Sequence, residues 1–489
     1  MLDRTTRTDE GQDSGRPLTR QTFLREGASS VGLAAVASPL GARGLALARQ
    51  ARQLAHRPLD AGRPVSLRFM IRGGVGYTAY FKAAGDAFRR QHPNVTISYE
   101  APSDFNTKLK VEMAGGVPPD LAFIGDDVMF SFAARGALLD LAPFFARAGL
   151  KRADYWPAAI DPQYLGPHLF ALPLDYGVYV MYYNKALFDR QHLSYPTDRW
   201  SWADWVQTAR HLTIDRAGKR ASEAGFQPAH VTQYAEDGQL PYWFLPVLRS
   251  YGGDWATSQL TQARLDTPVA VRTFQWIADV GNRYHTSISP KYPTSQSFAL
   301  EQGNVAMHFD GTWQNSTYPH YPALKWDQGT IDIAPFLKGT ASRGTGAEAS
   351  GLSIPAAATA GNVPWAWAFI KYMATEPGQR LAFRYGVASV PNTRALAHEL
   401  IPTLTQPRNS RIMLDLLPQA TLPYWSEAIS DADLEALLQN PWSPAPTLRD
   451  LYLGRTTAAR ALPQVNASVQ ALLDRDQQTA QRLGVTLHL

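Results

Sequence analysis

Cysteine is absent from the 489 residues of this chain. Its absence excludes disulfides, thiolate metal sites, a cysteine nucleophile and a lipidated N-terminal cysteine. Charged residues are scarce at 18%, whereas aromatic residues reach 11%. This balance is typical of a folded chain with a large buried core, and it excludes a disordered protein.

Evenly spread positive charge is also missing. The net charge is +5, but residues 1–57 hold nine Arg against five Asp or Glu and so account for +4 of it. The rest of the chain is close to neutral, which removes most of the case for a nucleic-acid partner. After the N-terminal leader no segment has 18 continuous apolar residues, so no membrane span is predicted.

Compact catalytic and metal-binding motifs are lacking as well. The 11 His form no HExxH spacing, no G-x-S-x-G elbow occurs, and no glycine-rich loop is followed by Lys-Ser or Lys-Thr. Lone histidines such as His308 and His285 are interpreted as incidental. We therefore expect no catalytic residues, no metal and no cofactor.

Residues 1–48 have the pattern of an export signal. Residues 18–25, LTRQTFLR, precede a mildly apolar run of Ala and Gly from 27 to 47. The segment resembles a twin-arginine leader, although Gln21 stands where the second Arg should be, so the general secretory route stays open. We expect export to the periplasm or the cell surface, with A-x-A cleavage candidates at 46–48 and 35–37.

A βα rhythm begins after an aperiodic segment, 49–64, that is interpreted as a linker. Residues 65–71 and 95–99 alternate as strands, and the helix between them, 77–91, follows a glycine-rich turn. Strands that alternate with helices of 10–15 residues predict a parallel, helix-covered sheet and an α/β fold. Two further helices have clear N-cap residues, Asp104 for the helix through Met113 and Ser201 for the helix 202–212.

The stretch 292–313 carries the most specific signal for function. A short helix ending at Gly303 leads into a strand, 305–309, and a tight turn then delivers Trp313 to the carboxyl end of that strand. In an open α/β sheet ligands bind at this end. An indole offers a flat apolar face and one N–H donor, which suits the C–H face of a sugar. The alternative is that Trp313 is a buried core residue.

The order of elements from about 65 to 400 resembles that of the family 1 extracellular solute-binding proteins of ABC importers, the group that contains maltose-binding protein. Each matching piece is short, and the ordered set carries the resemblance. The pieces are 115–121 (GGVPPDL), 134–141 (ARGALLDL), 172–174 with 182–185 (LPL and YYNK), 202–205 (WADW), 252–253 (GG), 298–313, 366–373 (AWAFIKYM) and 385–391 (YGVASVP).

The resemblance implies a two-lobe periplasmic-binding-protein fold of class II type, with a ligand cleft between the lobes and a hinge of crossing strands. It implies a monomeric, non-enzymatic binding protein that captures a mono- or oligosaccharide and delivers it to the permease subunits of an ABC transporter. On this pattern lobe 1 is 65–174 with 352–400, lobe 2 is 180–346 with 401–489, and the hinge lies near 174–179 and 347–354.

The resemblance also indicates residues that bind the ligand. It places a ligand-contacting acid at Asp127 and a stacking aromatic at Tyr242, with Trp243 beside it. The residues themselves leave helix capping open for Asp127 and Asp126 and core packing open for the two aromatics.

Three further candidates follow from their places along the chain, the first two in the hinge that the resemblance implies. Asp175 and Tyr176 lie in the first crossing, where they could bind sugar hydroxyls or satisfy strand ends. Gly74 opens the first helix, where backbone N–H groups could donate to ligand oxygens.

Two other functions remain open from the sequence. One is a secreted carbohydrate-active enzyme, although the adjacent carboxyls of Asp126 and Asp127 are poorly placed to flank a glycosidic bond, and Glu348 is a lone acid. The other is a receptor for a charged solute. A glycerol phosphodiester would need clustered Arg, and a polyamine would need several carboxylates.

Overall fold

The structure is a computed structural model that describes residues 49–292, 297–423, 428–429, 431–438 and 446–487. The chain divides into two compact units, and the second, Leu40–Leu489, contains all of the described residues. The predicted export signal, 1–48, lies outside the described residues.

The first half of the chain forms the predicted parallel strands. β1 (Val65–Met70) lies between β2 (Val95–Glu100) and β3 (Leu121–Ile124), and both pairs are parallel. The connecting helices are α3 (Val75–Gln91) and α4 (Phe105–Ala114), and α5 (Asp126–Ala134) follows β3. As predicted, Asp104 caps α4, its carboxylate accepting from the backbone N–H of Thr107.

The sheet as a whole is mixed, so the expectation of a parallel sheet is wrong beyond β1–β3. The seven strands run in the order β10-β6-β11-β3-β1-β2, with β9 also paired to β6. All pairings of the later strands are antiparallel, because the chain returns through the sheet in the opposite direction. These strands are β6 (Leu172–Asn184), β9 (Met307–Gly311), β10 (Ile331–Pro335) and β11 (Ala347–Ser353).

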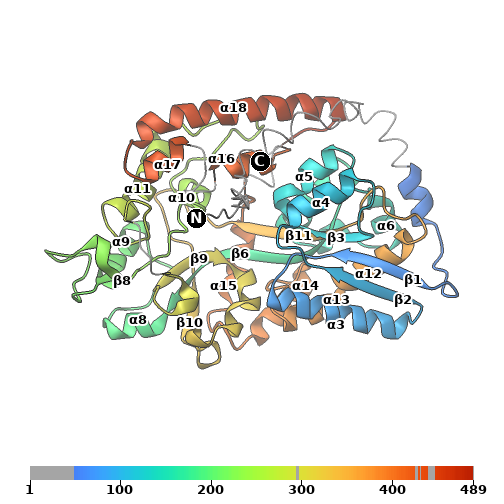
Figure 1. The fold of residues 1–489 in the computed structure, drawn as a ribbon, viewed down its shortest axis with the longest axis horizontal. Coiled ribbons are helices and arrows are strands. Elements are labelled where there is room, and N and C mark those ends of the chain that lie inside the picture. The colour runs from blue at the N-terminus through green and yellow to red at the C-terminus, as the bar shows by residue number, and fades with distance from the viewer. Residues whose placement is uncertain (1–48, 293–296, 424–427, 430, 439–445, 488–489) are drawn as a thin grey trace, which may run out of the picture. The chain divides into compact units, whose positions relative to one another are not determined.

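β6 is one fully buried strand of 13 residues, and it includes the whole of the first expected hinge segment, 174–179. Its first half pairs with β11, and its second half pairs with β9 and β10 (Figure 1). From Asp175 onward its side chains alternate between two faces. Tyr179, Met181 and Tyr183 join one core cluster, whereas the even-numbered residues Tyr176, Val178, Val180 and Tyr182 join another.

The helices of the second half pack on β9 and β10 through an aromatic-rich core. Trp202 and Trp205 are fully buried beside Phe309 and Phe336. Ser201 begins α9 with a capping box, which confirms the predicted N-cap. The main helices here are α8 (Lys185–Arg190), α9 (Trp202–Leu212), α10 (Phe244–Ser250) and α11 (Pro268–Asn282).

The segment after β11 returns to the first lobe. α12 (Val363–Ala374) packs on α3 and β1, and α13 (Glu376–Arg384) follows it directly. Pro377 occupies the first turn of α13, where proline is tolerated. Shorter helical elements follow: α14 (Arg394–Leu400), η10 (Ile401–Thr403), α15 (Ile412–Leu416) and η11 (Leu417–Gln419).

The C-terminal helices contact both lobes, whereas 401–489 was expected to belong to lobe 2 alone. α17 (Pro446–Tyr452) and α18 (Ala458–Leu483) pack on α11, but α16 (Asp431–Leu438) packs on α5 of the first lobe. Figure 1 shows α18 along the top of the view. Burial of Leu434 and Leu438 in the cluster that includes α5 explains the placement of α16.

Part of the expected linker is also packed. Residues 49–55 are helical, and Ala51, Leu54 and Ala55 are buried in the core cluster of the first lobe. The segment therefore belongs structurally to that lobe up to residue 55.

Candidate ligand-binding site

A cavity of about 370 Å³ lies where β1, β3, β6, β9 and β11 meet, within the size range of small-molecule sites. Arg72 and Gly73 follow the carboxyl end of β1, the edge at which open α/β sheets bind ligands. The lining combines aromatic rings with carboxyl, amide and hydroxyl groups. It consists of Arg72, Gly73, Tyr77, Phe123, Asp175, Gln239, Tyr242, Trp243, Asp310, Trp313, Glu348 and Ser350.

Trp313 lies in this lining at the position the sequence indicated. A short 3-10 turn ends at Gly303, β9 follows, and Trp313 stands in the next 3-10 turn, η6 (Thr312–Ser316). The indole is half-buried and rests against backbone, because a Cβ at Gly311 would lie 2.1 Å from its ring and one at Gly177 would lie 2.9 Å from it. Two glycines thus provide the surface on which the ring lies.

We expect Gly311→Ala to weaken ligand binding by about 1 kcal/mol, roughly fivefold, since the added methyl must displace the indole. Gly311 has an ordinary φ of −92°, so the effect is steric and involves no backbone strain. Calorimetric titration of the variant measures the loss. Gly62→Ala is the matched control, because its Cβ would meet only Asp60, at 3.5 Å. Equal ligand affinity in the wild type, Gly311→Ala and Gly62→Ala would contradict the role assigned to the indole.

Asp175 is the most deeply buried carboxyl in the cavity wall, with 7% of its surface exposed. Its Oδ2 accepts a short hydrogen bond from the Tyr77 hydroxyl, while its Oδ1 has no hydrogen-bond partner in the described part of the chain. The pKa of Asp175 is raised to about 7. Burial is the main cause and the charge of Asp126 adds to it, against the hydrogen bond from Tyr77 and the charge of Arg72.

Glu348 stands on β11, diagonal to Asp175 across the β6–β11 pair, and accepts a 2.6 Å hydrogen bond from the Tyr179 hydroxyl. Burial and the charges of Asp126, Asp310 and Asp127 hold the pKa of Glu348 well above its usual value, against the hydrogen bond from Tyr179. The sequence treated Glu348 as an isolated acid in a loop, but it is part of the cavity wall.

Asp127 does not line the cavity, contrary to the expectation of direct ligand contact. Its two carboxylate oxygens lie 2.6 and 2.7 Å from the Arg72 Nη2, and the Asn106 amide donates to it at 3.2 Å. Asp127 therefore holds Arg72, whose guanidinium reaches the lining. Asp126 is buried in the first turn of α5 and is also outside the lining.

The other predicted residues divide between wall and core. Tyr242 lines the cavity, and Gly73 does so in place of Gly74, which is the N-cap of α3. Trp243 lines the cavity but is only 3% exposed, and its indole N–H donates to the Phe309 carbonyl at 2.6 Å. Tyr176 is wrong as a ligand residue: strand alternation points it into the opposite core cluster, where it is fully buried.

His308 was interpreted as incidental, but it links the cavity wall to a buried carboxylate. Its Nδ1 lies 2.8 Å from Asp237, and its Nε2 lies 3.1 Å from Asp310, which in turn accepts from Gln314 at 2.6 Å. Burial lowers the pKa of His308, but the charges and hydrogen bonds of the two aspartates outweigh burial and hold it well above the usual value. The charged imidazole fixes Asp310 in the wall.

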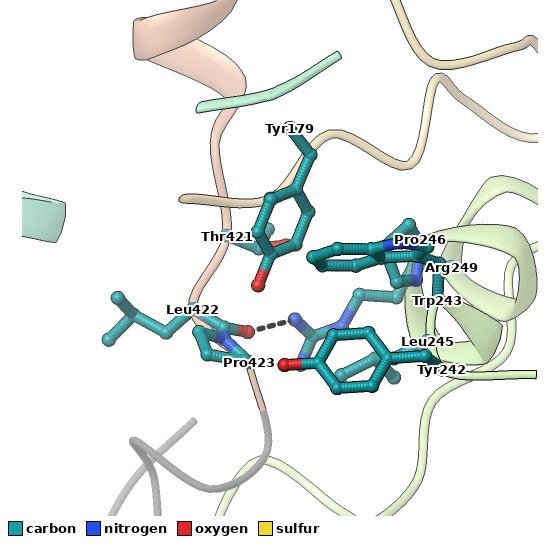
Figure 2. A pocket seen from close by; sticks show the side chains of 10 residues that line it. Tyr179, Tyr242, Trp243, Leu245, Pro246, Arg249, Thr421, Leu422 and Pro423 are labelled. Carbon is teal, nitrogen blue, oxygen red and sulfur yellow. Dashed lines mark hydrogen bonds between the residues drawn. The ribbon is translucent and has the colours of Figure 1, made fainter. Parts of the chain in front are cut away.

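A second, much smaller pocket adjoins the cavity behind Tyr242 and Trp243. Figure 2 shows these rings with Tyr179 around it, and the Arg249 guanidinium donates to the Leu422 carbonyl at 2.5 Å. Its volume of about 10 Å³ is roughly that of a single water. The larger cavity is therefore the candidate ligand site.

Comparison with known proteins places the chain in a family. The model for bacterial extracellular solute-binding proteins matches residues 74–380, more than half of the chain. The chain therefore belongs to this family, whose members bind solutes and are not enzymes. The resemblance inferred from the ordered motifs is confirmed.

The curated relatives are distant. The chain is 27% identical over 251 residues to the erythritol/L-threitol-binding protein of Mycolicibacterium smegmatis, covering 46% of this chain and 49% of that one. It is 23% identical over 297 residues to the maltotriose-binding protein of Pyrococcus abyssi, covering 61% and 60%. The chain thus spans about half to three fifths of the length of these relatives.

Solved structures confirm the two-lobe fold. The ABC substrate-binding protein Lmo0181 of Listeria monocytogenes, in complex with cycloalternan, matches with a TM-score of 0.71 and 18% identity, over 84% of this chain and 99% of that one. Among the described residues no helix combines the length and apolar character that crossing a membrane requires.

Proposed function

We propose that this chain is the substrate-binding component of an ABC importer, which captures a carbohydrate outside the cytoplasmic membrane and delivers it to the permease subunits. The observation that carries the proposal is the half-buried indole of Trp313 facing a cavity rimmed by Asp175, Gln239 and Glu348. Aromatic faces pack on sugar C–H groups, and carboxylate and amide oxygens accept hydrogen bonds from hydroxyls. The polyol and maltotriose relatives support the same class of ligand.

Hinge closure accompanies binding in this proposal. β6 and β11 cross between the lobes side by side, and both contribute side chains to the cavity. A ligand that contacts residues on both lobes binds the closed form better and shifts the population toward it.

A thermal-shift screen against mono- and oligosaccharides, followed by calorimetry and small-angle scattering, tests the proposal. We expect a sugar to raise the melting temperature, to make the protein more compact and to be recovered unchanged. A sugar present at 100 times its Kd should add about 2.7 kcal/mol of stability. Conversion of the sugar within minutes would instead support a carbohydrate-active enzyme, and failure of every sugar to bind would reject the proposal.

We further propose that the N-terminal segment exports the protein. A reporter fused after residue 60 is expected to leave the cytoplasm of a suitable bacterial host, because residues 18–47 have the order of a leader. Arg20→Lys tests the route: loss of export indicates the twin-arginine pathway, and unchanged export indicates the general secretory pathway. A reporter retained in the cytoplasm would reject both.

A further inference from the structure

Carboxyl groups outnumber cations in the cavity wall. Asp175, Asp310 and Glu348 line the cavity, whereas Arg72 is the one basic residue among the described lining residues. Both cations near the wall are matched by carboxylates: Arg72 lies against Asp127, and His308 lies between Asp237 and Asp310.

Asp175 and Glu348 form no ion pair in the described part of the chain, although the charge of Arg72 acts on Asp175. In the described part of the chain no Lys, Arg or His lies within ion-pair distance of either carboxyl, and their hydrogen bonds come from the hydroxyls of Tyr77 and Tyr179. They stand diagonally on adjacent antiparallel strands, at positions whose Cα atoms are about 7–8 Å apart. An ammonium group has three donors, so a single one can serve two carboxyls that face the same cavity.

An independent observation indicates that a donor is missing. The Oδ1 of Asp175 is buried and has no hydrogen-bond partner among the described residues, while its side chain lines the cavity. A buried acceptor without a partner is costly, so such groups are normally satisfied by protein, water or ligand. A donor on a bound ligand is one way to satisfy this oxygen.

We infer that the ligand is an aminated carbohydrate, whose ammonium group binds between Asp175 and Glu348 while a sugar ring packs on Trp313. This inference rests on the proposed carbohydrate-binding function and specifies its substrate class. A neutral sugar would supply no charge to offset these carboxyls in their ionised form, and a linear polyamine would leave the indole without a ring to stack on.

Proton release should accompany binding. Burial raises the pKa of Asp175 to about 7 in the free protein, and a cation beside it favours the charged form. Binding near or below pH 7 therefore releases protons from the carboxyls, and affinity rises with pH as long as the ligand amine stays protonated. The other titratable groups around the pair are Tyr77 on α3, Arg72 after β1, Asp126 and Asp127 on α5, Tyr179 on β6 and Asp310 on β9.

Calorimetry with matched sugar pairs tests the inference. The ligands are 2-amino-2-deoxy derivatives of glucose, galactose and mannose and their disaccharides, each beside its parent sugar and its N-acetyl derivative. At pH 7.5 we expect one amino sugar to bind at least about tenfold more tightly than both neutral counterparts, the effect typical of charge-assisted hydrogen bonds. Its binding enthalpy should vary with the ionisation enthalpy of the buffer.

Two variants locate the ammonium group. Asp175→Asn and Glu348→Gln are each expected to reduce the preference for the amino sugar about tenfold or more. Asp86→Asn removes an acid that is 61% exposed on α3 and should leave the preference unchanged. Retention of the preference in both cavity variants would overturn the assigned position.

The remaining outcomes distinguish failure of the amino-sugar inference from failure of the proposed carbohydrate-binding function. If a neutral sugar binds as tightly as its amino derivative, the inference is overturned while the carbohydrate-binding function stands. If spermidine binds and no sugar does, or if neither binds, both are overturned.

Discussion

Replacement of Asp175 by asparagine is expected to stabilise the ligand-free protein by about 4 kcal/mol at pH 8. Burial raises the pKa of this carboxyl from its usual 3.8 to about 7, and each pKa unit corresponds to about 1.4 kcal/mol. Asparagine retains an acceptor for Tyr77 but carries no charge. Urea unfolding of both proteins measures the difference in the free energy of unfolding.

The effect has a defined pH window. Because the pKa of Asp175 is higher in the folded state than in the unfolded state, the folded protein binds more protons between about pH 4 and 7. The Asp175 contribution to stability is therefore fully present below pH 4 and is lost as the pH rises to 7. The advantage of Asp175→Asn should vanish near pH 4. Asp86→Asn should stay within about 0.5 kcal/mol of wild type throughout. A variant no more stable than wild type at pH 8 would mean that Asp175 is solvated.

Trp313→Ala is expected to weaken binding of the identified sugar by ~1–3 kcal/mol, or about 5- to 150-fold. The half-buried indole lies between two glycines and the cavity, so its removal takes away the stacking surface. Calorimetry measures the affinity, and the urea midpoint of the same variant measures stability. The stability loss should be smaller than the roughly 3–5 kcal/mol typical of a core tryptophan.

Trp367 provides a matched control for this variant. It is also half-buried, but it lies on α12 against Phe144, in the core of the first lobe. Trp367→Ala should cost comparable stability and leave the affinity unchanged. If Trp313→Ala instead lowers the urea midpoint sharply and binds sugar normally, Trp313 is a core residue.

Local signals in the sequence were sufficient for several elements. Ser201 and Asp104 cap their helices as predicted, because a cap depends on residues three or four positions apart. The position of Trp313 followed from the Gly303 turn and the strand after it. The α/β class and the family followed from the order of such elements along the chain.

Side-chain direction limited the prediction of the site. Asp175 and Tyr176 were proposed together, although neighbours in a strand face opposite sides and only one of them could line the cavity. Asp127 was assigned to the ligand on the family resemblance, and nothing in its own segment indicates that Arg72, 55 residues earlier, pairs with it. Strand alternation could have excluded Tyr176, but the ion pair depends on the packing of α5 beside β1.

The remaining cavity residues could not be predicted because they converge from distant segments. Tyr77, Gln239, Asp310 and Glu348 come from a helix, a loop and two strands that are sequentially far apart. Their proximity depends on the sheet order, in which β11 lies between β6 and β3. Periodicity within a segment carries no information about that order.

The single long strand β6 limits which changes in sequence this protein can accept. The side chains of β6 from Asp175 to Tyr183 alternate between the cavity side and the opposite core. Deletion or insertion of one residue in the strand would therefore move the side chains of each face to the other face. A carboxyl would then enter an apolar core, and tyrosines would enter the binding surface. Ligand preference along β6 can therefore diverge by substitution at fixed length, whereas a change in the length of the strand would disrupt both faces.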